Sequence, residues 1–264
     1  MTDWQGVIDA DAAVPDGTPL TELVAELSRD LRSPDPVRRD QHAYSVLSRW
    51  ISRGVLDAAA MRRLGDEMAT RFDDPEIQTR TFAPLILAVI VSTGEFDPQW
   101  LEAFTTWYVT ETDLRGHDGD LGWLHAVAHG ADLLDEFGAH PAVDPAPLLE
   151  LAARRMLAPT PHVWRDQEDD RLAFALAHTL TRTELSAADA TAWLDAIAED
   201  FAAGVPGPVP PYATNTMRTL RLLYIAVDRG VRPDYRGDAV HIGHRDAVKT
   251  RLAEVLALVA PFVG

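Results

Sequence analysis

The sequence predicts an all-α fold, and three observations support this prediction. Residues that favour helices, such as alanine, leucine, arginine and glutamate, are abundant, and runs of β-branched residues are rare. No segment alternates apolar and polar residues as a half-buried strand would. Asp35 and Asp74, which each precede a proline, lie 39 residues apart, close to the repeat of about 40 residues in HEAT-type helix pairs. We therefore expect a HEAT- or armadillo-like superhelix, with a compact helical bundle as the alternative.

Helix starts are marked along the chain by a capping side chain followed by proline. Such a side chain accepts hydrogen bonds from the free N–H groups of the first turn, and proline at the first helical position loses no bond. Glycines fall where these helices are expected to end. The pairs are Thr18-Pro19, Ser33-Pro34, Asp74-Pro75, Asp97-Pro98 and Asp144-Pro145, and the glycines are Gly54, Gly94, Gly138, Gly204 and Gly230.

These signals divide the chain into a lead-in and a series of helices. Residues 1–17 are predicted to be a flexible lead-in, and residues 18–264 a single all-helical domain. The apolar run from Leu85 to Val91 is interpreted as part of a buried helix, because the pattern around it is helical. Stacked helix pairs would leave a concave surface free for binding. The expected helices cover residues 20–31, 35–52, 57–71, 75–93, 98–111, 120–138, 145–156, 167–181, 187–203, 212–229 and 244–260.

The composition restricts the partners and the chemistry that can be expected. The chain has 41 acidic and 24 basic residues and a net charge of −17. An acidic surface repels phosphate backbones, so we expect a small molecule, a peptide or a basic protein as partner and no nucleic acid. The chain contains no cysteine, which excludes disulfides, thiolate catalysis and cysteine-based zinc sites. With no signal peptide and no long apolar run, no membrane contact is predicted and a cytoplasmic protein is expected.

The stretch from 113 to 137 gathers the polar residues that could carry chemistry. On a helical wheel His125, His129, Asp132 and Glu136 share one narrow stripe, whereas Trp123 lies on the opposite side. Histidines one turn apart can bind one metal ion, so a divalent metal held by His125, His129 and Asp132 is one interpretation. The zincin pattern is absent, because Ala126 stands where a glutamate would follow the first histidine. The alternative interpretation is a solvated or hydrogen-bonded helix face.

Other candidate residues lie in the loop before this helix and in two later helices. Glu168 and Asp169 could act as acid and base if their helix lines the same groove as the histidines. Arg218 and Arg221, one turn apart, could hold an anion or a substrate carboxylate, although a surface or interhelix ion pair is the simpler explanation. The candidate ligand-binding residues are Asp113, Arg115, His117, Trp123, Asn215 and Arg218.

Several of these motifs resemble those of the bacterial domain-of-unknown-function 2785 family. The central motif is Glu-x-Asp-Leu-Arg-Gly followed by Gly-Trp-x-His-x-x-x-His-x-Ala-Asp-Leu-Leu, between Glu111 and Leu134. Outer motifs are Arg-Asp-x-x-Ala-Tyr from Arg39 to Tyr44, Glu-Asp-Asp-Arg-Leu-Ala from Glu168 to Ala173, and Asn215 with Leu223-Tyr224. The resemblance covers about residues 35–228. It implies an all-helical domain with His125, His129, Asp132, Arg115, Glu168 and Asp169 as motif residues, and it implies no substrate.

Two hypotheses about function follow from these observations. In the first, the protein is a helical-repeat binding protein whose acidic groove recognises a ligand, a peptide or a basic partner. In the second, it is a hydrolase or lyase that uses metal or acid–base chemistry. His125, His129 and Asp132 would then act together with Glu168 or Asp169. No known catalytic signature decides between the two hypotheses.

Overall fold

The structure, a computed structural model, describes residues 2–205, 207–234, 236–260 and 262, and its regular elements are almost entirely helical. This confirms the predicted all-α class. Every expected helix is present, and all but the one expected over 120–138 lie within a few residues of their predicted bounds. The α-helices are α1 (Trp4–Asp9), α2 (Leu20–Asp30), α3 (Ser45–Ser52), α4 (Ala58–Thr70), α5 (Ile77–Ser92), α6 (Pro98–Thr110), α7 (Ala126–Ala139), α8 (Ala146–Leu157), α9 (Glu168–Thr179), α10 (Asp189–Ala202), α11 (Pro211–Arg229) and α12 (Arg245–Ala257).

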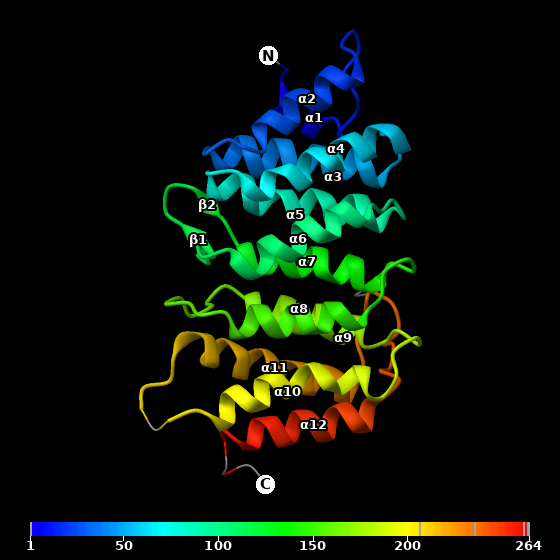
Figure 1. Cartoon of the computed structure of the whole chain (residues 1–264). Helices are drawn as coiled ribbons and strands as arrows, with labels where there is room; N and C mark the ends of the chain where they lie inside the picture. The colour runs from blue at the N-terminus through cyan, green and yellow to red at the C-terminus, as the bar shows by residue number, and fades with distance from the viewer. Residues whose placement is uncertain (1, 206, 235, 261, 263–264) are drawn as a thin grey trace.

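The helices are stacked from α1 and α2 at one end of the molecule to α12 at the other (Figure 1). Two rows run along this stack. Helices α3, α5, α7, α9 and α11 pack side by side in one row, and α4, α6, α8, α10 and α12 follow one another in the second row. Each helix buries one face against its neighbours, which is how amphipathic helices form a continuous core.

Helix α5 is the most deeply buried helix of the first row. It packs against α3 and α4 on one side and α7 on the other, and Ile86, Leu87 and Ile90 have no exposed surface. An apolar surface all round is what a helix enclosed by others requires. The interpretation of residues 85–91 as part of a buried helix is therefore confirmed.

The predicted lead-in contains a helix of its own. Helix α1 lies within residues 1–17, and Trp4 is buried with its ring 6.0 Å from that of Trp50. The indole of Trp50 donates a hydrogen bond of 2.7 Å to the carbonyl of Ala12. These contacts attach the first residues to helix α3.

Two further helices differ from their predicted form at the N-terminal end. The helix expected over 35–52 begins as a π-helix, η1 (Val37–Tyr44), and continues as α3. The helix expected over 120–138 begins only at Ala126. Residues 117–123 instead form a hairpin of two short antiparallel strands, β1 (His117–Asp118) and β2 (Gly122–Trp123). The side chain of Asp118 stabilises the turn by accepting from the backbone N–H groups of Asp120 and Leu121 at 2.9 and 3.0 Å.

Arg39, from the π-helix, holds this hairpin against the helical stack. Its guanidinium has no exposed surface, lies 4.6 Å from the Phe82 ring centroid and donates to the carbonyls of Leu121 at 2.6 Å and Trp123 at 3.3 Å. Asp40 balances the charge at 2.7 Å from Nε.

Replacing Arg39 with methionine is expected to lower the free energy of unfolding by about 2 kcal/mol, because the carbonyls of Leu121 and Trp123 and the carboxylate of Asp40 lose a buried cationic partner. Urea unfolding followed by circular dichroism measures this change. Arg53→Met is the matched control, because the Arg53 side chain is 46% exposed and pairs with the exposed Asp11. Equal losses in the two variants would contradict the role given to Arg39.

Within the residues described, no helix is both long enough and apolar enough to cross a membrane.

Candidate functional site

A cleft of about 590 Å³ opens where the hairpin, the start of α7 and the loop before α9 meet the π-helix and α5. It contains polar side chains from four separate segments and a half-exposed tryptophan, a mixture typical of ligand sites. The lining residues are Asp40, Tyr44, Phe82, Leu85, Trp123, His125, His129, Arg165, Asp166, Gln167 and Arg171.

His125 stands at the entrance to helix α7 in a left-handed backbone conformation, with φ 48° and ψ 41°. Its backbone N–H donates to the carbonyls of Arg115 and Gly116 at 3.1 and 3.2 Å, which joins the end of the hairpin to its beginning. Its Nε2 atom is buried and has no hydrogen-bond partner among the described residues. Burial, followed by the positive charge of Arg171, lowers the pKa of His125, so the ring is neutral near pH 7.

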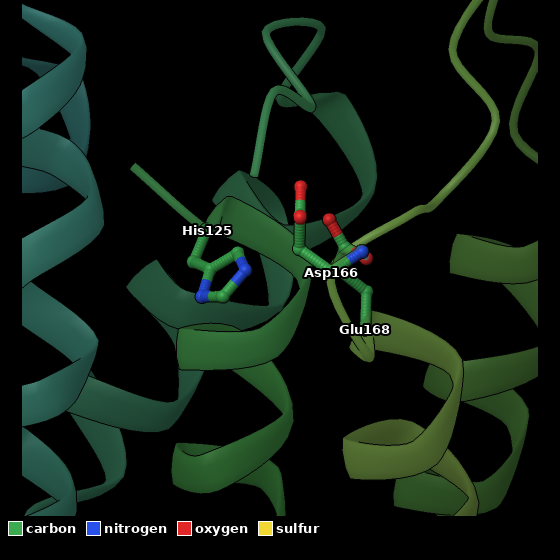
Figure 2. Close-up of side chains that lie close together, drawn as sticks. All are labelled: His125, Asp166 and Glu168. Atoms are coloured by element: carbon green, nitrogen blue, oxygen red, sulfur yellow. Dashed lines mark hydrogen bonds between the residues drawn. The ribbon is translucent and has the colours of Figure 1, made fainter. Parts of the chain in front are cut away.

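Asp166, in the loop before α9, and Glu168, the first residue of α9, face His125 on either side of Gln167 (Figure 2). One ligand atom from each of His125, Asp166 and Glu168 lies within 4.8 Å of the others. Glu168 is 1% exposed; its Oε2 accepts from the backbone N–H of Asp166 at 2.7 Å, and its Oε1 is buried without a partner among the described residues. Burial, then the nearby carboxylates of Asp166 and Asp169, raises the pKa of Glu168.

His129 lies behind His125, one turn into the helix, with its ring centroid 5.6 Å from that of His125. It is buried, and its Nδ1 donates to the carbonyl of Thr81 in α5 at 2.9 Å. Burial, followed by the proximity of His125, lowers the pKa of His129 to about 3. The side chain is therefore a neutral part of the α5–α7 contact.

Asp132 is directed to a different partner from the two histidines. It forms a two-pronged ion pair with Arg171 of α9, with an Nε to Oδ1 distance of 2.7 Å. Among the described residues, the group with metal-ligand spacing is His125, Asp166 and Glu168, and it includes neither Asp132 nor His129. The wheel that placed four residues on one stripe assumed that His125 is helical, whereas its left-handed backbone turns the chain at that point.

The loop residues expected to bind a ligand are mostly engaged with one another. Arg115 donates to both carboxylate oxygens of Asp113 at 2.9 and 2.6 Å and to Asp118 at 2.5 Å, and these partners raise its pKa. Trp123 was placed on the buried side of a helix, but in strand β2 it is 44% exposed. Its ring lies 4.8 Å from His117 and 4.5 Å from His125, at the rim of the cleft.

Asn215 and Arg218 of α11 hold the loop that carries Asp166. Asn215 accepts from the backbone N–H of Trp164 at 3.0 Å and donates to the carbonyl of His162 at 3.0 Å. Arg218 donates to the carbonyl of Trp164 at 2.5 Å and pairs with Asp169 at 2.7 Å. Asp169 therefore faces α11, whereas Glu168 faces His125. Both α11 residues position the site and do not line the cleft.

A second hollow, of about 400 Å³, continues from the cleft along α5, α7 and α9, and we call it the acidic pocket. It shares Tyr44, Leu85, Gln167 and Arg171 with the cleft. Four carboxylates and a phenylalanine distinguish it. They are Asp132, Asp135, Glu136, Asp170 and Phe174.

Some site residues were not singled out from the sequence, although partial signals for them are present. Asp166 lies two positions before Glu168 in an acidic segment, but nothing local shows that it faces His125. Arg171 stands in the motif that begins at Glu168, but only the folded chain shows its ion pair with Asp132 of α7. Glu136 was placed on the stripe with His125, but only the folded chain shows that it lines the acidic pocket. Gly116 stands in the central motif, but only the folded chain shows that it lies against Asp166 and Glu168.

These features define an all-helical protein with a polar cleft on one row of its helices. The chain belongs to a family described as protein of unknown function, DUF2785, whose model matches residues 68–225, more than half of the chain. The match includes the cleft residues of α7 and α9, whereas the Arg39–Tyr44 motif lies before it. The chain matches no curated protein and no solved structure in these comparisons.

Proposed function

We propose that the protein is a HEAT- or armadillo-like binding protein whose acidic pocket recognises a lysine or arginine side chain of a peptide or basic protein. The two rows of stacked helices support a superhelix of helix pairs, because α3, α5, α7, α9 and α11 of the first row pack side by side in series. The cleft and the acidic pocket both open on helices of this row.

The observation that carries this proposal is the state of Glu136. Its carboxylate is half-buried in the acidic pocket, and no cation pairs with it among the residues described. Burial, followed by the charge of Asp135 and then Asp132, raises the pKa of Glu136 to about 7. A cationic group in the pocket would relieve this repulsion and would be favoured by the low polarisability of the surroundings.

The walls of the acidic pocket suit the remainder of a basic side chain. Leu85, Tyr44 and Phe174 provide apolar and aromatic surface for methylene groups, while the carboxylates would receive the charged end. Arg171 already occupies one such position, where it pairs with Asp132. The net charge of −17 would also speed the approach of a basic partner.

Binding of defined peptides tests the proposal. Fluorescein-labelled decapeptides with two lysines or two arginines are compared by anisotropy with versions that carry glutamine at the same positions. We expect binding of the basic peptides only, weakened by salt. Glu136→Gln should weaken it by about 10-fold, in line with the loss of one buried charge contact.

The matched control is Glu150→Gln, because Glu150 is an exposed carboxylate on α8 in the second row of helices. This variant removes the same charge from the whole protein and should bind like the wild type. The proposal fails if neither basic peptide binds, or if the two variants weaken binding equally.

A second candidate function is acid–base or metal-assisted hydrolysis or elimination in the cleft. It is favoured by His125 and Glu168, since the pKa of His125 is lowered and that of Glu168 is raised. An imidazole with a lowered pKa beside a carboxyl group with a raised pKa can serve as base and acid. Turnover of a panel of carboxylic esters, phosphate esters and amides, lost in Glu168→Gln, would support an enzyme. No turnover of any class by the wild type would count against it.

A further inference from the structure

We infer that His125, Asp166 and Glu168 form a binding site for one divalent transition-metal ion, with Zn²⁺ or Mn²⁺ as the fitting ions. The three ligand atoms lie within 4.8 Å of one another and come from the start of α7 and the start of α9 (Figure 2). Atoms that share an ion at bonds of about 2.1 Å are about 3–4 Å apart, so small side-chain movements complete the shell.

Two buried atoms at this place have no other role in the structure. Nε2 of His125 and Oε1 of Glu168 are both buried without a hydrogen-bond partner among the residues described, and Glu168 is 1% exposed. Buried polar atoms without a partner are rare, because each one loses its hydrogen bonds to water and gains none within the protein. A cation between them would satisfy both atoms and would neutralise the paired carboxylates.

The backbone around the cluster leaves space for the two carboxylates. A Cβ atom at Gly116 would lie 2.2 Å from Oδ2 of Asp166 and 2.8 Å from Oε1 of Glu168, so a larger residue would enter the site itself. His125 and Gln167 also have positive φ values of 48° and 69°, which non-glycine residues seldom adopt. His125 is one of the inferred ligands, and Gln167 lies between the other two, Asp166 and Glu168. Strained backbone of this kind is common at functional sites.

The chemistry of the ligands selects among metal ions. One imidazole nitrogen with two carboxylate oxygens suits Zn²⁺ and Mn²⁺, whereas Ca²⁺ and Mg²⁺ prefer oxygen ligands alone. Three protein ligands would leave a coordination position that opens into the cleft, as in catalytic zinc sites.

The test is a calorimetric titration of the full, tag-free chain, treated with EDTA and dialysed, with ZnCl₂, MnCl₂ or MgCl₂. Elemental analysis of the gel-filtered protein gives the stoichiometry. We expect one Zn²⁺ or Mn²⁺ per chain and little binding of Mg²⁺. His125→Gln and Glu168→Gln should weaken binding by about 100-fold, as expected for the loss of a direct ligand. Gly116→Ala should weaken it similarly while all three ligands remain.

Asp170→Asn is the matched control, because Asp170 is an exposed acid in the same first turn of α9 and lies outside the cluster. It should bind metal like the wild type. Circular dichroism and the thermal midpoint show whether each variant is folded, and the ion should raise the midpoint of the wild type but not of His125→Gln. No binding of either ion by the wild type, or equal weakening in Asp170→Asn, would overturn the inference.

The metal site and the acidic pocket can be tested separately. Glu136→Gln should keep its metal, and His125→Gln should keep its affinity for a basic peptide, because the two sets of residues do not overlap. Metal binding without peptide binding would therefore refute the proposed function and leave the metal site intact.

Discussion

Replacing His129 with asparagine is expected to remove a large part of the protein's sensitivity to acid. The pKa of His129 is about 3 in the folded chain, compared with 6.5 for a free histidine. The unfolded chain therefore binds a proton between these pH values that the folded chain does not bind. Stability falls by about 1.4 kcal/mol for each pH unit below 6.5, or about 3 kcal/mol at pH 4.5.

The sign of this effect follows from the surroundings of His129. Burial disfavours the imidazolium most, and His125, Arg171 and Arg39 add positive charge nearby. Only the Thr81 carbonyl favours the protonated ring. The stability that the neutral ring contributes is complete above pH 6.5 and is lost as the pH falls towards 3. An asparagine amide does not titrate and can still donate to the Thr81 carbonyl.

Urea unfolding of the wild type and of His129→Asn at pH 7.5 and pH 4.5 measures the effect. The change in the free energy of unfolding between the two pH values is compared for the two proteins. His178→Asn is the control, because the hydrogen bond to Asp135 at 2.8 Å raises the pKa of His178. The pair stabilises the fold at low pH, so this variant should become more sensitive to acid and His129→Asn less. Equal pH dependence in wild type and His129→Asn would contradict the buried neutral state of the ring.

The fold could largely be predicted because helix signals are local. Asp97 illustrates this: its side chain accepts from the N–H of Gln99 at 2.9 Å, and Pro98 occupies the first helical position, as expected. The hairpin was missed because tertiary contacts stabilise it. Residues 120–125 fit a helical pattern, but Gly122 has a φ of +70° and Arg39 holds two hairpin carbonyls. Arg39 is more than 80 positions away in the sequence.

The candidate site was predictable to the extent that its residues stand in two recognisable motifs. His125 and Glu168 were both singled out, and the condition that their helices line one groove is met, since α7 and α9 pack side by side. The wheel could not show that Arg171 from another helix pairs with Asp132, or that Asp166 turns towards His125. These contacts depend on the register between two helices, which a single sequence does not reveal.

Glu136→Gln is expected to make the protein more stable in alkaline solution. The pKa of Glu136 is about 7 in the folded chain and 4.5 in a free glutamate. The folded chain holds a proton between these values that the unfolded chain has lost, so stability falls as the pH rises from 4.5 to 7. Above pH 7 the ionised carboxylate costs up to about 3 kcal/mol. Glutamine has the same shape without this cost.

Urea unfolding at pH 8 and pH 4.5 tests this expectation, with the exposed Glu150→Gln as control. The gain in Glu136→Gln should be present at pH 8 and absent at pH 4.5, and the control should match the wild type at both. If Glu136→Gln is no more stable than the wild type at pH 8, the ionised carboxylate of Glu136 does not destabilise the fold. If the stabilised variant also loses basic peptides, the same carboxylate weakens the fold and binds the ligand. Such a trade-off is typical of functional residues and is absent from residues that only fill a surface.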